Sequence, residues 1–370
     1  MTRLGSLGWI VCTLAACSAP AGATTDGAGG TTGSTGATGS TGIIGSTGTT
    51  GDTSTGTGGT APTTTTGDAP DGRLRLHQLQ ALGTHNSYHL SPGSLIKEWD
   101  YTHLPLDQQL GDQGVRKFEL DLWFTGVGEP IAVYHIDLLD TASTCPTLVD
   151  CLMTLRTWSE GHPSHHPLYV MLELKSAFDP PAAQELLATL ESQVLSIWPE
   201  ERLIVPDDVQ GAAANLRDGV AAGGWPAIDD ARGKLLLVLH DGGKWREAYT
   251  AGGTAGRLLF PDAFGDLTLP FAAVHSLNDP VGDAARIDAA VAAGHLVRTR
   301  ADADNIEPSA GDLSRGAAAL ASGAHFISTD YPPPGGDKYD YVFAIPGGMP
   351  SRCNPRTAPP DCTPAAIEAP

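Results

Sequence analysis

Basic residues are scarce in this chain of 370 residues, which has 22 lysines and arginines against 42 aspartates and glutamates and a formal net charge of −20. Nucleic acids and anionic membranes attract proteins through clustered positive charge. This balance therefore argues against nucleic acid binding and against a broad electrostatic attachment to anionic membranes. Contact with a membrane would instead need apolar loops or a lipid anchor.

The sequence also lacks an apolar run of the roughly 20 residues that a membrane-spanning helix needs. The run from Leu7 to Ala16, which follows Arg3, is too short for this and is typical of a secretion signal. Cys17 follows a Leu-Ala-Ala sequence, an order that resembles the bacterial lipobox, in which the cysteine is lipidated and becomes the new N-terminus. Ordinary cleavage after a small residue is the alternative. We expect residues 1–17 to be a lipoprotein-type signal peptide and the rest of the chain to lie outside the cytoplasm, at the bacterial cell envelope.

Apolar residues are also few in segment 18–72, which from Ala21 to Asp71 is almost wholly glycine, threonine, serine and alanine. Such a segment buries too little apolar surface to offset its chain entropy, so we predict a disordered tether. A glycine-rich coil of about 50 residues has an end-to-end distance on the order of 35–40 Å, enough to hold a domain clear of a surface. The remaining residues, 73–370, suit one large domain.

Cysteine is infrequent, with six residues, two of which belong to the signal segment. The other four suit an oxidising compartment. Local spacing favours the pairs Cys145–Cys151 and Cys353–Cys362 among the three possible pairings. A zinc site is the alternative, but the spacings match no zinc finger and a nearby histidine ligand is missing. We therefore expect two disulfides.

What the chain does contain is a regular alternation of apolar runs with helical patterns. We predict eight strands, at residues 78–83, 115–121, 131–135, 168–174, 234–240, 270–275, 295–300 and 325–329. Helices are predicted at 179–198, 280–293 and 312–321, and the glycine-rich segment 241–265 is predicted to be a loop at the barrel mouth. Alternating strands and helices of this kind indicate an α/β fold, here a TIM-type (β/α)8 barrel in a single catalytic domain.

Polar side chains stand at the ends of four successive predicted strands. They are His85 and Asn86 after the first, Glu119 and Asp121 on the second, His135 at the end of the third, and Glu173 and Lys175 at the end of the fourth. Side chains alternate across a strand, so Glu119 and Asp121 share one face. Taken singly, a histidine after a strand is often a turn residue and Glu-x-Asp is often a solvated face. In a barrel, however, the C-terminal strand ends converge on the active-site face, so four such groups favour a functional site.

Carboxylate and amide oxygens are hard ligands that suit Ca²⁺ or Mg²⁺ and not a thiolate-binding metal. Glu119, Asp121, Glu173 and the Asn86 carbonyl would form a flexible, oxygen-rich site, which favours Ca²⁺ over Mg²⁺. The histidines are then free for proton transfer, since imidazole titrates near neutral pH. A phosphodiester needs both a cation to neutralise its oxygens and proton transfers at the attacking and leaving oxygens.

Six segments resemble the phosphatidylinositol-specific phospholipase C superfamily, and most closely its bacterial calcium-dependent branch. They are THNSYH at 84–89, LDQQLGDQGVRKFELDLW at 106–123, YHIDLLDTASTC at 134–145, HPLYVMLELKS at 166–176, LVRTRADAD at 296–304 and ALASGAHFISTDYP at 319–332. Together they span nearly all of residues 75–332 in the expected order, although the last is shared with related glycerophosphodiesterases. The resemblance implies that the inositol 2-hydroxyl attacks phosphorus and expels diacylglycerol, which gives a cyclic inositol phosphate.

The same resemblance implies a role for each strand-end residue. By this resemblance, His85 contacts the phosphate and His135 protonates the leaving group. Ca²⁺ is held by Asn86, Glu119, Asp121 and Glu173, and one of the carboxylates is also a candidate for the base. Lys175 contacts a substrate phosphate or the inositol.

Polar residues later in the chain are less specific. Arg298 and Arg300 alternate on one face with Asp302 close by, and could bind phosphate or headgroup hydroxyls. A structural Arg–Asp pair is an equally good interpretation. Asp330 closes the last strand, and His240 ends the fifth and could face the pocket, but the family offers no role for it. The remaining histidines of interest are expected to be surface or turn residues: His89, His103, His162, His165 and His166.

Two other classes of protein stay open. A glycerophosphodiesterase or a sphingomyelinase-D-like enzyme would use the same barrel, but those families usually place arginine after the first histidine, where Asn86 stands. A non-catalytic surface lipoprotein is disfavoured by the presence of both histidines and all three carboxylates. We expect a monomer that acts on an inositol phospholipid or related phosphodiester at a membrane surface. The sequence leaves the identity of the lipid open.

Overall fold

The computed structural model describes residues 72–370, apart from 94–95, 336–337, 349 and 369–370. The signal peptide expected at 1–17, with Cys17, and the tether expected at 18–72, except its last residue, lie outside the described residues. Within the described part of the chain, no helix is both long enough and apolar enough to span a membrane.

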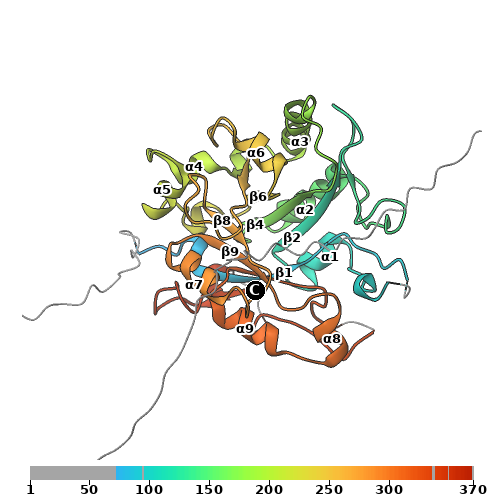
Figure 1. Ribbon diagram of the computed structural model, residues 1–370. Coiled ribbons are helices and arrows are strands. Elements are labelled where there is room, and N and C mark those ends of the chain that lie inside the picture. Colours follow the sequence, from blue (N-terminus) through green and yellow to red (C-terminus); the bar gives the residue numbers. More distant parts are fainter. Residues whose placement is uncertain (1–71, 94–95, 336–337, 349, 369–370) are drawn as a thin grey trace, which may run out of the picture. The chain divides into compact units, whose positions relative to one another are not determined.

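Eight parallel strands pair side by side in a ring at the centre of the domain (Figure 1). In ring order they are β1 (Leu79–Thr84), β2 (Lys117–Trp123), β4 (Leu168–Leu174), β6 (Leu235–His240), β7 (Leu259–Pro261), β8 (Val274–Ser276), β9 (Leu296–Arg300) and β10 (Phe326–Thr329). The ring closes because β10 pairs with β1 and a single parallel bridge from Asp262 to Val274 joins β7 to β8. The predicted TIM-type (β/α)8 barrel is confirmed.

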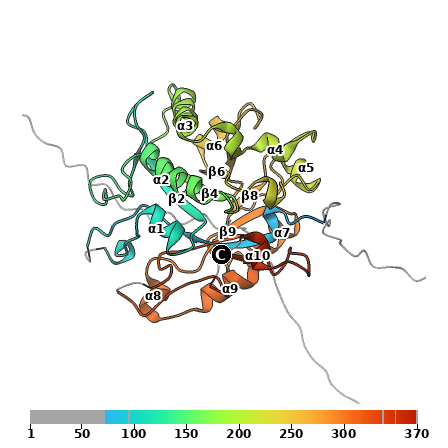
Figure 2. The ribbon, with the colours of Figure 1, turned by 180° about the vertical axis from the view of Figure 1, so that it is seen from behind.

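Helices surround these strands on the outside, as both the front and the back views show (Figures 1 and 2). They are α1 (Leu106–Gly111), α2 (Leu148–Gly161), α3 (Ala183–Ile197), α4 (Pro206–Gln210), α5 (Leu216–Ala221), α6 (Lys244–Thr250), α7 (Ala284–Ala292), α8 (Ile306–Ala310), α9 (Ser314–Ser322) and α10 (Pro364–Ile367). Three short strands lie off the ring: β3 (Ala132–Val133), β5 (Leu203–Ile204) and β11 (Ser351–Cys353). The helices predicted from the sequence at 179–198, 280–293 and 312–321 correspond to α3, α7 and α9.

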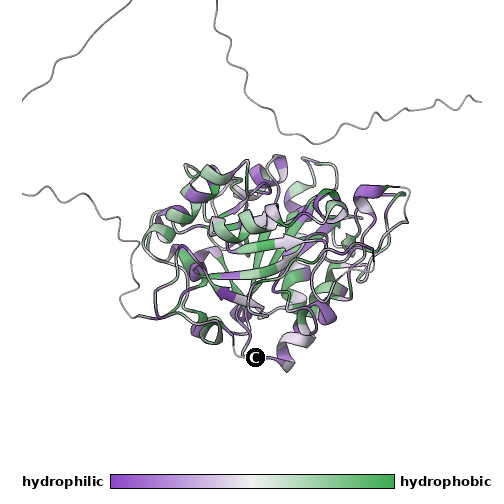
Figure 3. Cartoon of the chain, turned by 90° about the horizontal axis from the view of Figure 1, so that it is seen from below, coloured by the Kyte–Doolittle hydropathy of each residue, from purple (hydrophilic) through white to green (hydrophobic). Residues whose placement is uncertain are grey.

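The alternation of side chains along the strands separates two cores. On β2, Phe118, Leu120 and Leu122 are fully buried in a cluster that includes residues of α2 and α3. Met171 and Val238, on neighbouring strands, belong to a second cluster. Figure 3 shows apolar strands in the middle of the domain and mixed polar and apolar helices around them. The opposite face of β2 is therefore left to point into the barrel, and it carries the charged residues of the site.

Two segments differ from the sequence prediction. Residues 131–135 do not form a barrel strand, because β3 pairs antiparallel to β2 as the return arm of a hairpin. Eight residues separate the two strands, and a parallel crossover needs about a dozen or more. Segment 241–265, predicted as a loop, instead contains α6 and the barrel strand β7. That strand has only three residues, one of them proline, so it gives almost no periodic signal.

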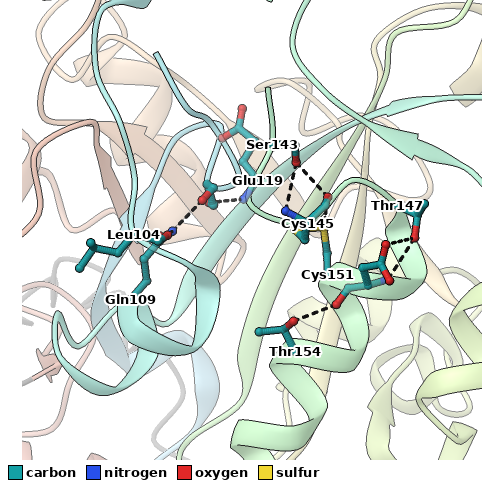
Figure 4. The surroundings of a disulfide bond; sticks show 10 residues. Leu104, Gln109, Glu119, Ser143, Cys145, Thr147, Cys151 and Thr154 are labelled. Carbon is teal, nitrogen blue, oxygen red and sulfur yellow. Dashed lines mark hydrogen bonds between the residues drawn. A yellow bond between two sulfur atoms is a disulfide. The ribbon is translucent and has the colours of Figure 1, made fainter. Parts of the chain in front are cut away.

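Both disulfides favoured by the spacing are present. Cys145–Cys151 has an S–S distance of 2.08 Å, and Cys353–Cys362 one of 2.02 Å. The first ties the loop before α2 to the helix itself, beside the Thr147 hydroxyl that caps it by accepting from the Asp150 backbone N–H (Figure 4). This loop leads from His135 to α2, and the disulfide fixes the end of the loop that adjoins the helix.

A protein that begins at Gly72 is expected to fold like the longer form without its signal. The residues upstream offer almost no apolar surface to bury, and the first strand begins only at Leu79. Thermal unfolding followed by circular dichroism should give the same midpoint for both proteins within about 1–2 °C. A shortened protein that is insoluble or melts many degrees lower would show that the domain begins earlier.

Candidate active site

The first strand-end histidine, His85, lies in a hydrogen-bonded group at the ends of β1, β9 and β10. Its Nδ1 is 3.0 Å from Asp330 Oδ1, and Arg300 approaches both, with one guanidinium nitrogen 2.9 Å from Asp330 Oδ2 and another 3.4 Å from His85 Nε2. The Tyr101 hydroxyl is 3.3 Å from His85 Nδ1. A guanidinium only donates, so His85 Nε2 is the accepting nitrogen and Nδ1–H donates to Asp330. Desolvation and the Arg300 charge lower the pKa of His85 to about 4.

The second histidine, His135, is held by a carboxylate five residues further along the chain. His135 Nδ1 lies 2.9 Å from Asp140 Oδ2, and the ring stands edge-on to Trp99. The same carboxylate oxygen is 2.7 Å from His89 Nε2. Burial by itself would raise the pKa of Asp140, but the hydrogen bonds from both histidines hold it below its usual range. His135 keeps 14% of its side chain exposed, whereas Asp140 and His89 are completely buried.

An acidic cluster occupies the barrel interior between adjacent strands. Asp121 on β2 is in register with Glu173 on β4, and Glu173 is in register with His240 on β6. Glu119 lies one inward position deeper on β2, and its carboxylate, that of Glu173 and a ring nitrogen of His240 come within 4.8 Å of one another. The sequence therefore assembles three carboxylates from two strands, as predicted, and adds a histidine to them.

Cations surround this cluster and set its ionisation. Glu119 Oε2 is 2.5 Å from Lys117 Nζ and 2.6 Å from an Arg298 guanidinium nitrogen. Burial would raise the pKa of Glu119, but Arg298 and Lys117 together hold it well below its usual range. Lys175 Nζ lies between two acids, 2.6 Å from Glu173 Oε1 and 3.2 Å from Asp121 Oδ2. Burial lowers the pKa of Lys117 to about 7, partly offset by Glu119.

Lys117 reaches its place because β1 has a glycine next to it. A Cβ atom at Gly83 would lie 2.8 Å from the Lys117 Cδ atom and 2.9 Å from its Cβ. The lysine chain passes through that space and donates to the Thr84 carbonyl, 3.0 Å away, as well as to Glu119. Gly83 thus permits a close approach that any larger residue would block.

Asp121 fits a bound cation. It is completely buried, and it shares the Lys175 ammonium with Glu173, at 3.2 Å from Asp121 Oδ2 and 2.6 Å from Glu173 Oε1. Burial and the neighbouring Glu173 charge raise the pKa of Asp121 well above its usual value. Two neighbouring buried carboxylates that share one ammonium are costly, and a divalent ion between Asp121, Glu173 and Glu119 would relieve the cost. Hard oxygen donors of this kind suit Ca²⁺.

The other predicted residues divide between the pocket and its support. Asn86 is 2% exposed and has a left-handed backbone, φ 42°, directly after His85. Arg298 and Arg300 both reach the site, where each is bound to a carboxylate, Glu119 or Asp330. Asp302 is completely buried and accepts a hydrogen bond from the Asp330 backbone N–H at 2.8 Å, so its side chain braces Asp330.

Four of the five histidines expected to be surface or turn residues are buried, namely His89, His103, His165 and His166, and His162 is exposed. A surface position is therefore wrong for these four. His89 and His165 do lie in turns, because the backbone N–H of each donates to the carbonyl three residues earlier. Burial follows from their hydrogen bonds, since His103 Nε2 donates to the His85 carbonyl at 2.8 Å and His89 contacts Asp140. The sequence alone does not reveal that such a histidine is buried, because the residue that it contacts lies far along the chain.

Several residues of the site escaped the sequence analysis. They are Tyr101, Lys117, Asp140 and Asp262, the last of which lies 2.8 Å from His240 Nδ1 through Oδ2. Two of them carried a usable signal, because Lys117 and Asp140 lie within motifs already singled out, and Lys117 shares the strand face of Glu119 and Asp121. Tyr101 and Asp262 become recognisable only when the fold brings them beside their histidines.

A (β/α)8 barrel with carboxylate-backed histidines and an acidic cluster at its C-terminal strand ends defines a phospholipase C-like phosphodiesterase. The comparison with protein families gives the particular one. The chain belongs to the family of Ca²⁺-dependent phosphoinositide phospholipases C, whose model matches residues 74–128 and 125–355. It is a member of a family of phosphodiester-cleaving enzymes, as the motifs predicted.

Solved structures of this kind are similar in fold. The calcium-dependent phosphoinositol-specific phospholipase C of a Gram-negative Pseudomonas species matches with a TM-score of 0.56 and 18% identity, over 76% of this chain and 95% of that one. Its myo-inositol complex gives 0.57 and 19%, over 76% and 96%. The Ca²⁺-dependent enzyme of Streptomyces antibioticus gives 0.53 and 22%, over 70% and 95%. Among curated protein sequences, none matches the chain significantly.

Proposed function

We propose that this protein is an exported, calcium-dependent enzyme that cleaves phosphatidylinositol into diacylglycerol and a cyclic inositol phosphate. One observation carries the proposal: two histidines, His85 and His135, are each held by a buried carboxylate at the mouth of a barrel that also contains the acidic cluster. This arrangement provides the two proton transfers and the charge neutralisation that a phosphodiester requires. The disulfides support export, since they persist in oxidising compartments.

His135 is assigned as the general acid. Its Nδ1–H is directed to Asp140, so Nε2 is the nitrogen that meets the leaving oxygen of the substrate. The carboxylate stabilises the imidazolium form from which the proton is given. Partial exposure of the ring, 14%, is consistent with contact to a substrate at the mouth.

His85 is assigned as the acceptor of the proton from the attacking 2-hydroxyl. A contact from His85 to phosphate, the role that the resemblance implies, would need a proton on Nε2, and this nitrogen faces the Arg300 donor instead. Arg300 is the better partner for a phosphate oxygen, because a guanidinium can donate two hydrogen bonds at once. Lys175 would contact a phosphate or the inositol ring, as the sequence predicted.

Asn86, Glu119, Asp121 and Glu173 would hold Ca²⁺. When bound, the ion neutralises charge on the phosphoryl oxygens. Asp121 is the best-supported ligand because it is completely buried beside Glu173 and shares a single ammonium, that of Lys175, with it. Lys117 and Arg298 keep Glu119 ionised, and Lys175 does the same for Glu173, whose pKa burial would raise but Lys175 and His240 hold down.

Apolar contact with a membrane would come from the turn that joins His135 to Asp140. Leu138 and Leu139 are 89% and 61% exposed at its tip, and Leu138 has a left-handed backbone, φ 64°. Two leucines beside the general acid offset the lack of basic charge, since each fully buried leucine contributes about 1.5–3 kcal/mol.

Replacing Leu138 by asparagine and Leu139 by serine should therefore weaken binding to phosphatidylinositol vesicles by roughly 10- to 100-fold. Asparagine tolerates the left-handed backbone, so the loss would not come from strain. Turnover of a soluble short-chain substrate should stay within about twofold. Leu195→Ser, at an exposed site on α3, is the matched control. Vesicle sedimentation that shows equal binding for all three proteins would remove this turn from the membrane contact.

The substrate class is tested by offering a panel of phosphodiester lipids with Ca²⁺ and identifying products by mass spectrometry. We expect diacylglycerol from phosphatidylinositol and little from phosphatidylcholine or sphingomyelin. Faster release of choline, or of the headgroup alcohol from a glycerophosphodiester, would assign the protein to another class of phosphodiesterase.

A further inference from the structure

His89 is the least exposed histidine of the site, and both of its ring nitrogens face hydrogen-bond acceptors. Nε2 is 2.7 Å from Asp140 Oδ2, and Nδ1 is 3.0 Å from the backbone carbonyl of Tyr101. The ring stacks at a tilt against Tyr101, with centroids 4.5 Å apart, and stands edge-on to His135 at 5.8 Å. Its side chain has no exposed surface.

Two acceptors require two protons on this ring. A carbonyl oxygen never donates, so Nδ1 must carry a proton. Asp140 accepts from His135 through the same oxygen, and its pKa is held below the usual range, so the carboxylate is ionised and Nε2 must carry a proton as well. His89 and Asp140 then form a buried ion pair, which satisfies the rule that a buried charge needs a partner.

Titratable groups beside this pair are His135, Tyr101 and His103. His135 belongs to the same turn as Asp140, and Tyr101 and His103 lie on the segment beside His89. His85 meets the far side of Tyr101 through the tyrosine hydroxyl. Tyr101 is thus held at both ends, since its hydroxyl contacts the proposed base and its carbonyl contacts His89.

We propose that His89 is a positioning residue for the general acid: a buried imidazolium that orients Asp140 and neutralises its charge. The inference rests on the proposed function, because it gives His135 the role of acid. A carboxylate that served His135 alone would hold the imidazolium proton more tightly. With His89 sharing Asp140, the proton passes more readily from His135 Nε2 to the leaving oxygen as the P–O bond breaks. His135 keeps its Nδ1–H bond to Asp140 throughout, and His89 keeps both protons.

The test uses substitutions at residue 89 on two substrates. His89→Ala should lower kcat on phosphatidylinositol by about 10- to 100-fold, the usual cost of removing a partner that orients a functional group, with KM nearly unchanged. On a nitrophenyl phosphodiester, whose leaving group needs no proton, the loss should be under about threefold. His89→Gln keeps one N–H donor without the charge and should recover only part of the loss. A glutamine variant with wild-type kcat would overturn the charge assignment.

A double-mutant cycle separates positioning from general loosening of the fold. Adding His89→Ala to a His135→Ala protein should cost no further activity, because His89 acts only through His135. A loss that is equal in both backgrounds and on both substrates would mean that His89 is merely structural. His325→Gln is the matched control, since His325 is equally buried and its ring accepts from the Val297 N–H and donates to the His77 carbonyl, away from this group. Its kcat should equal wild type.

A spectroscopic measurement stands apart from activity. In ¹⁵N-histidine NMR of the whole protein at neutral pH, one imidazole that disappears in His89→Gln should show bonded protons on both nitrogens. A single bonded proton would place the second proton elsewhere and contradict the inference. This NMR measurement needs no substrate, so it remains valid even if the protein does not cleave phosphatidylinositol. If the wild type does cleave the lipid and His89→Ala has unaltered kinetics, the inference about His89 is wrong while the proposed function stands.

Discussion

Chelation of calcium is expected to abolish turnover, and added Ca²⁺ to restore it more fully than Mg²⁺. Three carboxylates and an amide carbonyl would form an irregular, oxygen-rich site that the larger ion accommodates better. Asp121→Asn should weaken Ca²⁺ binding by roughly 10- to 100-fold in calorimetry, because it removes a charge from the ligand set without changing its shape. Glu191→Gln changes an acid that is bonded to Tyr249 and lies outside the cluster, so its Ca²⁺ affinity should be unchanged.

Full activity after exhaustive chelation would remove Glu119, Asp121 and Glu173 from the role of ligands. Calcium binding that is unaffected by Asp121→Asn would remove this residue from the ligand set.

Replacing His135 by alanine is expected to lower kcat on phosphatidylinositol by 10²- to 10⁴-fold, the range typical of a lost general acid. The loss should shrink strongly for a nitrophenyl leaving group, which departs without a proton. His85→Ala should behave differently, because its role at the attacking hydroxyl is needed whatever group leaves. Both substrates should then suffer alike.

Stopped assays on the two substrates with the two variants give a matrix of four rates. Equal damage from both substitutions on both substrates would mean that the acid and base are misassigned. Near-normal activity of either variant on phosphatidylinositol would place the chemistry elsewhere in the barrel.

Much of this site was predictable because local order decides it. Alternation along β2 places Glu119 and Asp121 on one face, and parallel pairing then sets Asp121 beside Glu173. Motif order supplied the family for the same reason, since each motif is a strand with its own end. The alternation of strands and helices predicted the barrel, even though the segment of β3 was expected to be a barrel strand and the segment of β7 was expected to be a loop.

The parts that could not be predicted depend on ring closure. His85 and Asp330 are 245 residues apart in sequence, and their hydrogen bond exists only because β10 returns to pair with β1. Arg298 meets Glu119 across the barrel interior over 179 residues. His89 was expected to be a surface or turn residue because its partner, Asp140, lies 51 residues further along the chain. Short-range periodicity reports which face a residue occupies, but not which residue shares that face.

The most direct test of the proposed cleavage is ³¹P NMR of phosphatidylinositol during turnover with Ca²⁺. We expect the lipid resonance to decay while that of a cyclic phosphodiester grows, in step with diacylglycerol in the organic phase. This result follows from attack by the inositol 2-hydroxyl, with His85 taking its proton and His135 protonating the leaving oxygen. Appearance of phosphatidic acid with free inositol, or no change at phosphorus with Ca²⁺ present, would contradict it.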